Sequence, residues 1–238
     1  RNEWAKVQER FQSIQFNESA ATTINMVGQA IKREKPLPKA IENVITKELE
    51  MLTAAEISLP LGMDAKEFTA CAKSAWPLHP TVLLAIPHLF RRLAQNERSI
   101  FSYLTSMEPF GFLETICQME AGGGNFIRLT DIYAYLLANF EVGLSRIPHA
   151  KRLLEANDII NSNARLTQEQ LELIRSISLL NVLGEMSTLK ATPELLTCAA
   201  SNIPGVIKEL GKLRTQSILT YRRLDDTYRV WEGSDVDI

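Results

Sequence analysis

The sequence predicts a mainly α-helical protein that ends in a β-hairpin. Apolar residues recur at helical spacing through most of the chain, up to about residue 213. Prolines and helix-capping residues separate these periodic segments. Near the C-terminus, two short runs at 217–222 and 227–231 flank a turn at 224–226, which is typical of a hairpin.

The composition is that of an ordinary globular protein: 238 residues, 45% hydrophobic, 23% charged, with a net charge of -2. The chain contains no apolar run of 18 residues, so no membrane span is expected. Three cysteines lie far apart among apolar residues and without a CxxC spacing, which favours reduced thiols in the interior of a cytoplasmic protein. These cysteines are Cys71, Cys117 and Cys198.

Residues 1–75 are expected to form a helical segment. The first stretch, 4–16, predicts a short helix that runs into a strand. Ser19 is positioned to cap a following helix, which prolines at 36 and 38 end. Apolar spacing predicts further helices over 40–52 and 64–74.

Residues 76–160 are expected to form a second helical region. Two prolines at 77 and 80 are expected to keep the chain extended before helices at 81–93, 97–104 and 130–140. Three consecutive glycines, 122–124, predict a loop. They lack the Gly-Lys-Ser/Thr that follows in a phosphate-binding P-loop.

Residues 161–238 show the clearest helix boundaries. Thr167 and Gln170 form a capping-box pair, and Gly184 closes the helix that they begin. Thr192 precedes a proline and starts a second helix, and 205–213 predict a third. Three helices followed by a hairpin is the order of elements in a winged-helix domain.

The sequence offers no self-sufficient active site. It contains no GxSxG motif and no pairing of cysteine with histidine suited to nucleophilic catalysis, and its three histidines lack metal-ligand spacing. Asp225 and Asp226 are best explained as turn residues. Arg91 and Arg92 are expected to face solvent or to form ion pairs.

Arg98 is the most interesting single residue, because it lies in the first turn of a predicted helix. A guanidinium carries a fixed charge and a planar fork of donors suited to phosphate oxygens. The alternative is an ion pair with Glu97 or another carboxylate.

Basic residues gather near the C-terminus and exceed the acidic residues of the same stretch, 208–229, by three. Such residues can meet the phosphates of a nucleic acid, although the excess is modest. The six basic residues are Lys208, Lys212, Arg214, Arg222, Arg223 and Arg229.

Several blocks in order resemble the lid region and winged-helix-like end of large bacterial P-loop ATPases. The blocks are Trp-Pro-Leu-His-Pro at 76–80, Phe-Arg-Arg at 90–92, a Gln-Asn-Glu-Arg-Ser stretch at 95–104, Ile-Ser-Leu-Leu-Asn at 177–181 and Tyr-Arg-Val-Trp-Glu-Gly-Ser-Asp at 228–235. The similar proteins are AAA+ or STAND-related ATPases of phage-defence systems, including BREX-like ones.

The resemblance implies roles for two arginines. Arg98 matches a sensor-2-type arginine that contacts the terminal phosphates of the nucleotide, and Arg10 is a weaker match to an arginine finger. The chain lacks both Walker A and Walker B, so ATP and Mg²⁺ are expected to be bound mainly by an upstream core, with this chain starting inside a longer protein. Partners implied are that core, a second copy of the chain, a defence-system protein or DNA.

Three functions therefore remain open. A lid that senses nucleotide predicts that Arg98 points into a cleft facing the ATPase core. A winged-helix DNA-binding module predicts that the six basic side chains share one exposed face. A protein-interaction scaffold predicts an apolar surface patch, with Trp231 or the 110–112 stretch exposed.

Overall fold

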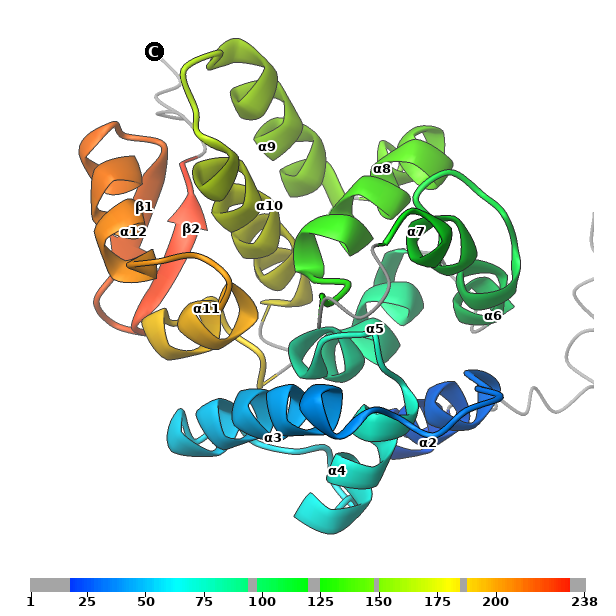
Figure 1. Cartoon of the computed structure of the whole chain (residues 1–238). Helices are drawn as coiled ribbons and strands as arrows, with labels where there is room; N and C mark the ends of the chain where they lie inside the picture. The colour runs from blue at the N-terminus through cyan, green and yellow to red at the C-terminus, as the bar shows by residue number, and fades with distance from the viewer. Residues whose placement is uncertain (1–17, 94–97, 120–124, 148–149, 185–187, 232–238) are drawn as a thin grey trace, which may run out of the picture.

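The structure is a computed structural model that describes residues 18–93, 98–119, 125–147, 150–184 and 188–231. Within these ranges the chain forms eleven helices and one two-stranded antiparallel sheet at its C-terminal end (Figure 1). The prediction of a mainly helical protein with a C-terminal hairpin is therefore confirmed. No helix in the described part is both long and apolar enough to cross a lipid bilayer.

Helices α2 (Ala20–Ala30), α3 (Lys39–Ala54) and α4 (Ala65–Ser74) form the lower part of the molecule in Figure 1. The Ser19 side chain accepts a hydrogen bond from the first turn of α2, as predicted. Asp64 caps α4 through a capping box. These caps satisfy backbone N–H groups that a helix start leaves without partners, which is why the sequence marks both boundaries.

The Trp-Pro-Leu-His-Pro block forms a turn followed by one β-bridge, rather than a continuously extended segment. The Trp76–Pro77 peptide bond is cis, and Leu78 then pairs with Ile127 in a parallel bridge. The His79 amide donates to the Ile127 carbonyl over 2.9 Å, and the Ile127 amide donates to the Pro77 carbonyl over 2.8 Å. This bridge ties the start of α5 (Pro80–Leu93) to the segment that precedes α8 (Leu129–Leu144).

Three helices follow α5: α6 (Arg98–Thr105), α7 (Phe112–Gln118) and α8 (Leu129–Leu144). All but three residues of α5 are buried. An aromatic cluster fills the space between α5, α6 and α8, with ring centroids of neighbouring members 4.8 to 6.0 Å apart. Its members are Phe90, Tyr103 and Tyr135.

Helix α10 (Gln168–Leu183) lies at the centre of the fold, with α9 (Lys151–Ser162) alongside it (Figure 1). Thr167 and Gln170 form the predicted capping box, and Gly184 ends the helix with a positive φ of 58°. Helix α10 contacts α5, α8 and α9, and it also contacts α11 (Pro193–Ala199), α12 (Val206–Thr215) and strand β2 (Thr227–Val230). Most of its residues are buried as a result, including polar ones.

The C-terminal part contains α11 (Pro193–Ala199), α12 (Val206–Thr215), β1 (Leu219–Arg222) and β2 (Thr227–Val230). The strands pair in register, with Leu219 opposite Val230 and Arg222 opposite Thr227. The Asp225–Asp226 pair lies in the connecting turn, as predicted, and Asp226 has a positive φ of 53°.

The buried hydrophobic residues of the described part belong to one cluster that includes members from all three predicted regions. The division at 75/76 and 160/161 stays a prediction. One cysteine prediction is wrong: Cys71 and Cys198 are buried, but Cys117 is exposed, because the short helix α7 turns it outward. Several predictions fall outside the described residues: the helix and strand of 4–16, the loop at 122–124 and the end of the 228–235 block.

Candidate functional site

Of the two arginines predicted to act on a nucleotide, one lies in the described part of the chain. Arg98 is the first residue of α6, which agrees with its predicted position in a first helical turn. Its side chain is not among those that the structure describes. Arg10 lies outside the described residues altogether. The roles of both arginines therefore stay predictions.

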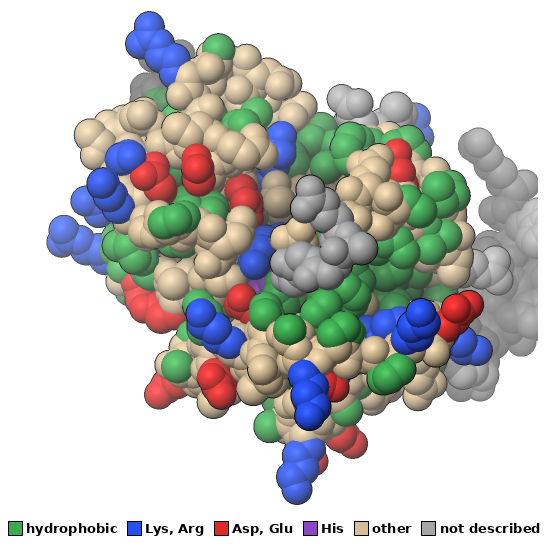
Figure 2. All heavy atoms as spheres, viewed as in Figure 1, with side chains coloured by type: hydrophobic (Ala, Val, Ile, Leu, Met, Phe, Trp, Pro, Cys, Tyr) green, Lys and Arg blue, Asp and Glu red, His purple; other side chains and the backbone are tan. Residues whose placement is uncertain are grey.

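The six predicted nucleic-acid-binding residues all lie on α12 and the hairpin that follows it. Five of them are exposed, and Arg229 is half-buried. Acidic neighbours offset part of their charge. Lys212 pairs with Glu209 at 2.6 Å, and one Asp225 oxygen lies 3.9 Å from Arg222 and 3.8 Å from Arg229. Figure 2 shows basic side chains projecting from the molecule over α12, with acidic ones beside them.

A cleft of about 610 Å³ lies next to the hairpin, and its charged lining is mainly basic. We call it the basic cleft. It is bounded by the ends of α5 and α10, the start of α9, the segment at 190–191 and the hairpin. Its charged residues are Arg92, Arg152, Lys190, Arg229 and one carboxylate, Asp225.

Among the cations of the basic cleft, the sequence predicted a binding role only for Arg229, and Arg92 was expected to face solvent or to form an ion pair. The other three, Arg92, Arg152 and Lys190, are separated by 60 and 38 residues in the sequence, and no local pattern links them. Within the cleft, Arg92 Nη1 donates to the Leu183 carbonyl over 3.3 Å, at the C-terminal end of α10. A cation at this helix end also meets the negative end of the helix dipole.

A second hollow is apolar and has a volume of about 540 Å³. It lies between the end of α2, the 76–77 turn, α6 and α7, and apolar residues line most of it: Ile31, Trp76, Leu104, Phe112, Leu113, Ile116 and Met119. The residues named in the scaffold hypothesis differ in exposure, and the hypothesis stays a prediction. Phe110 is 52% exposed and Trp231 is 45% exposed, whereas Phe112 is buried.

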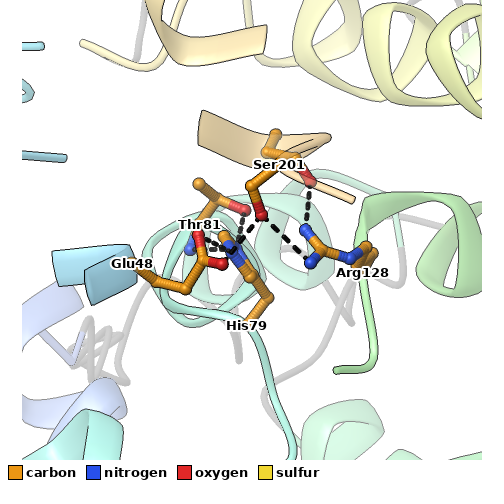
Figure 3. Close-up of polar contacts among 6 residues, drawn as sticks. Glu48, His79, Thr81, Arg128 and Ser201 are labelled. Carbon is orange, nitrogen blue, oxygen red and sulfur yellow. Dashed lines mark hydrogen bonds and ion pairs between the residues drawn. The ribbon is translucent and has the colours of Figure 1, made fainter. Parts of the chain in front are cut away.

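A buried polar network lies where α3, α5, the start of α8 and the end of α11 meet (Figure 3). His79 is at its centre and is 0% exposed. Its Nδ1 accepts a hydrogen bond from the Thr81 amide over 3.2 Å and lies 2.8 Å from the Thr81 hydroxyl. Since Nδ1 accepts, the proton of a neutral ring is on Nε2, which lies 3.2 Å from a Glu48 carboxylate oxygen.

The network continues across to the C-terminal part. Ser201 donates to the other Glu48 oxygen over 2.9 Å and accepts from Arg128 Nη2 over 3.1 Å. Arg128 Nη1 donates to the Ala199 carbonyl over 2.9 Å, at the end of α11. Side chains separated by up to 153 residues in the sequence thus satisfy one another inside the protein.

Burial and neighbouring charges set the protonation of this network. Burial lowers the pKa of His79 to about 4, partly opposed by its hydrogen bond to Glu48. Burial alone would raise the pKa of Glu48. Hydrogen bonds from His79 and Ser201, with the charge of Arg128, bring that pKa below its usual value instead. Near neutral pH the network therefore contains a neutral imidazole, a carboxylate and a guanidinium.

The buried network is suited to holding elements together and not to acting on a substrate. His79 has no exposed surface, and Glu48 and Arg128 are buried as well. Buried charged groups are costly unless they are paired and hydrogen-bonded, so this network favours one arrangement of the elements that supply it.

The low pKa of His79 predicts that acid destabilises the protein. Between its usual pKa of 6.5 and its folded value of about 4, the unfolded chain binds a proton that the folded chain does not. The free energy of unfolding should therefore fall as the pH drops through this window, by on the order of 3 kcal/mol at most. Urea unfolding of the wild type and of His79→Gln between these pH values measures the effect.

The substitution His79→Gln should make the free energy of unfolding depend less on pH, whatever it does to stability at neutral pH. His88 is the matched control: burial lowers its pKa too, but it is only half-buried. His88→Gln should keep most of the change in the free energy of unfolding with pH. Equal slopes in the wild type and in His79→Gln would show that His79 does not carry this pH dependence.

Comparison of the chain with protein-family models, curated proteins and solved structures finds no match. Within the part of the chain that the structure describes, no group of three or more His, Cys, Asp or Glu residues is arranged to hold a metal ion. The features that bear on function are therefore the basic cleft, the apolar hollow, the basic surface on α12 and the hairpin, and the buried network.

Proposed function

We propose that this chain is a non-catalytic part of a larger P-loop ATPase and transmits the state of the bound nucleotide to a winged-helix-like part. The buried network is the observation that carries the proposal. It joins α5, which leads along the chain towards Arg98, to the end of α11 in the C-terminal part. In this proposal the ATPase is of the phage-defence type that the sequence resembles.

The network gives a physical reason why these parts move together. If α5 shifted away from α3 and α11, the bonds among His79, Glu48 and Ser201 would lengthen. Each separated group would then lose a partner without gaining water, at about 1–3 kcal/mol for a neutral group and more for a charged one. A displacement of α5 is therefore cheaper when α11 follows it.

The order of elements in the C-terminal part supports the winged-helix-like assignment. Helices α10, α11 and α12 precede the β1–β2 hairpin, and the hairpin packs against α10 and α12. The amide of Tyr228 in β2 also donates to the Ala191 carbonyl over 2.9 Å, just before α11. The hairpin is thus attached to the helices at several points.

In this proposal the upstream core holds ATP and Mg²⁺, and Arg98 reaches the terminal phosphates from the start of α6. In the protein extended to include that core, Arg98→Ala should lower the rate of ATP hydrolysis by about tenfold or more, equivalent to about 1.4 kcal/mol of transition-state stabilisation. The reason is the loss of a fixed positive charge where negative charge develops. Steady-state phosphate release measures the rate.

Arg146→Ala is the control, because Arg146 is exposed in the turn after α8. It should leave the rate within about twofold. Circular dichroism of both variants shows whether the fold is intact. Unchanged hydrolysis in a folded Arg98→Ala protein would remove Arg98 from the mechanism and leave an interaction role for the chain.

DNA binding is the second candidate function, and the exposure of five of the six basic residues on α12 and the hairpin favours it. Against it stand the nearby carboxylates that pair with Lys212, Arg222 and Arg229. Binding through backbone phosphates would weaken steeply with salt. The DNA arm of the experiment below tests this function at the same time.

A further inference from the structure

The basic cleft brings together four cations that no sequence pattern connects. They come from the end of α5, the start of α9, the segment before α11 and the hairpin. Among the lining residues that the structure describes, one carboxylate, Asp225, offsets part of this charge. Like charges that converge in a concave site focus positive potential and raise the local concentration of anions.

Two arginines of the cleft have contacts that position their guanidinium groups. Arg92 donates to the Leu183 carbonyl over 3.3 Å, and Arg229 lies 3.8 Å from an Asp225 oxygen. Both of these arginines, and Arg152, are half-buried, whereas Lys190 is exposed at the rim. A guanidinium held in place loses less entropy when it binds a ligand, and its planar fork matches two oxygens of a phosphate.

The volume of the cleft and its apolar lining residues restrict the class of anion that fits it. A volume of about 610 Å³ falls in the range of sites for small molecules and cofactors. Four apolar residues form part of the lining beside the cations: Leu180, Val182, Ala191 and Leu224. A ligand with a charged end and a less polar remainder fits this lining better than a bare ion does.

We propose that the basic cleft is a binding site for a phosphate-bearing ligand of nucleotide size, held mainly by Arg92, Arg152, Lys190 and Arg229. The same phosphate chemistry is offered by a free nucleotide and by a segment of nucleic-acid backbone. The site is separate from the predicted nucleotide contact of Arg98, and it requires neither an ATPase core nor hydrolysis. Its test therefore stands or fails independently of the function proposed above.

The test uses the 238-residue chain and isothermal titration calorimetry with three probes: inorganic tripolyphosphate, ADP and a short DNA duplex. Lys190→Glu reverses an exposed charge at the cleft, and the control Lys66→Glu reverses an exposed charge on α4, outside the cleft. Lys208→Glu, on α12, serves only the duplex titration. Lys190→Glu should weaken tripolyphosphate binding by about tenfold. Lys66→Glu should change it by less than about twofold, because Lys66 does not line the cleft and exposed charges are screened by salt.

Arg152→Gln provides a second variant within the cleft and should also weaken tripolyphosphate binding by about tenfold. Thermal melts establish that each variant is folded. If ADP binds, if its binding depends on Lys190, and if the duplex does not displace it, then the phosphate that the cleft recognises belongs to a free nucleotide. If the duplex binds, if its binding depends on Lys190, and if it competes with tripolyphosphate, then the phosphate that the cleft recognises belongs to a nucleic-acid backbone.

Three results would overturn the site. The first is that no probe binds at millimolar concentration in low salt. The second is that Lys190→Glu and Lys66→Glu weaken tripolyphosphate binding equally, which would indicate a general electrostatic effect. The third is duplex binding that depends on Lys208 and not on Lys190, which would place the phosphates on the α12 surface and support the DNA-binding candidate without the cleft.

Discussion

Replacing Arg128 by methionine is expected to lower the free energy of unfolding by about 3–5 kcal/mol. Arg128 is 9% exposed, donates to the Ala199 carbonyl and to Ser201, and lies with its guanidinium carbon 5.7 Å from the centre of the Phe126 ring. Methionine keeps much of the side-chain volume but leaves the buried Glu48 carboxylate without its nearby positive charge. An uncompensated buried charge is far costlier than a lost surface interaction.

Urea unfolding followed by circular dichroism measures this loss. Arg165→Met is the matched control, because Arg165 is exposed just before α10. The same chemical change there should alter the free energy of unfolding by less than about 0.5 kcal/mol. A loss below about 1 kcal/mol for Arg128→Met would show that the network tolerates removal of its cation and does not hold α8 and α11 together.

The substitution Phe90→Ala is expected to lower the free energy of unfolding by about 3–5 kcal/mol as well, for a different reason. Phe90 is 0% exposed, and the centres of the Tyr103 and Tyr135 rings lie 5.7 and 6.0 Å from its own. Alanine removes these ring contacts and leaves a cavity among α5, α6 and α8. The surrounding helices cannot close such a cavity completely.

The control for this cavity is Phe101→Ala, on the exposed side of α6. Phe101 is 42% exposed, so its truncation should cost less than about 1 kcal/mol. The denaturant midpoints of both variants give the two losses, provided that the free energy of unfolding depends on denaturant concentration with the same slope in both. Similar losses at Phe90 and Phe101 would mean that the aromatic cluster is not the main packing contact between α5 and α6.

Helix boundaries were predictable where a side chain marks them. Ser19, Asp64, Thr167 and Thr192 each cap a helix in the structure, and Gly184 ends one. These residues act on backbone groups within the same turn, so the signal is local in sequence.

Helices α7 and α9 were not predicted, because neither begins with such a mark. Gly111 precedes α7 and Ala150 precedes α9, and neither residue offers a side-chain cap. Helix α7 has only seven residues, too few for a periodic pattern. Only Leu153 and Ala156 of α9 are fully buried, so its apolar stripe is narrow. Packing against α8 and α10 stabilises α9 instead.

The candidate sites were less predictable than the fold, because tertiary contacts create them. Glu48 and Ser201 are 153 residues apart, and nothing local to either indicates the other. Within the Trp-Pro-Leu-His-Pro block, His79 carried one usable signal: a polar residue between apolar neighbours that lead into a buried helix. The basic residues on α12 and the hairpin were predictable because they lie close together in the sequence.

The distribution of the cysteines has a practical consequence. Burial raises the pKa of Cys71, and it raises that of Cys198 to about 11, so neither thiol readily forms the thiolate that reacts with alkylating reagents. Cys117 is exposed on α7, next to Ile116 in the wall of the apolar hollow. A maleimide fluorophore would therefore attach mainly at one known position, and the unmodified sequence already provides an optical reporter for anything that enters that hollow.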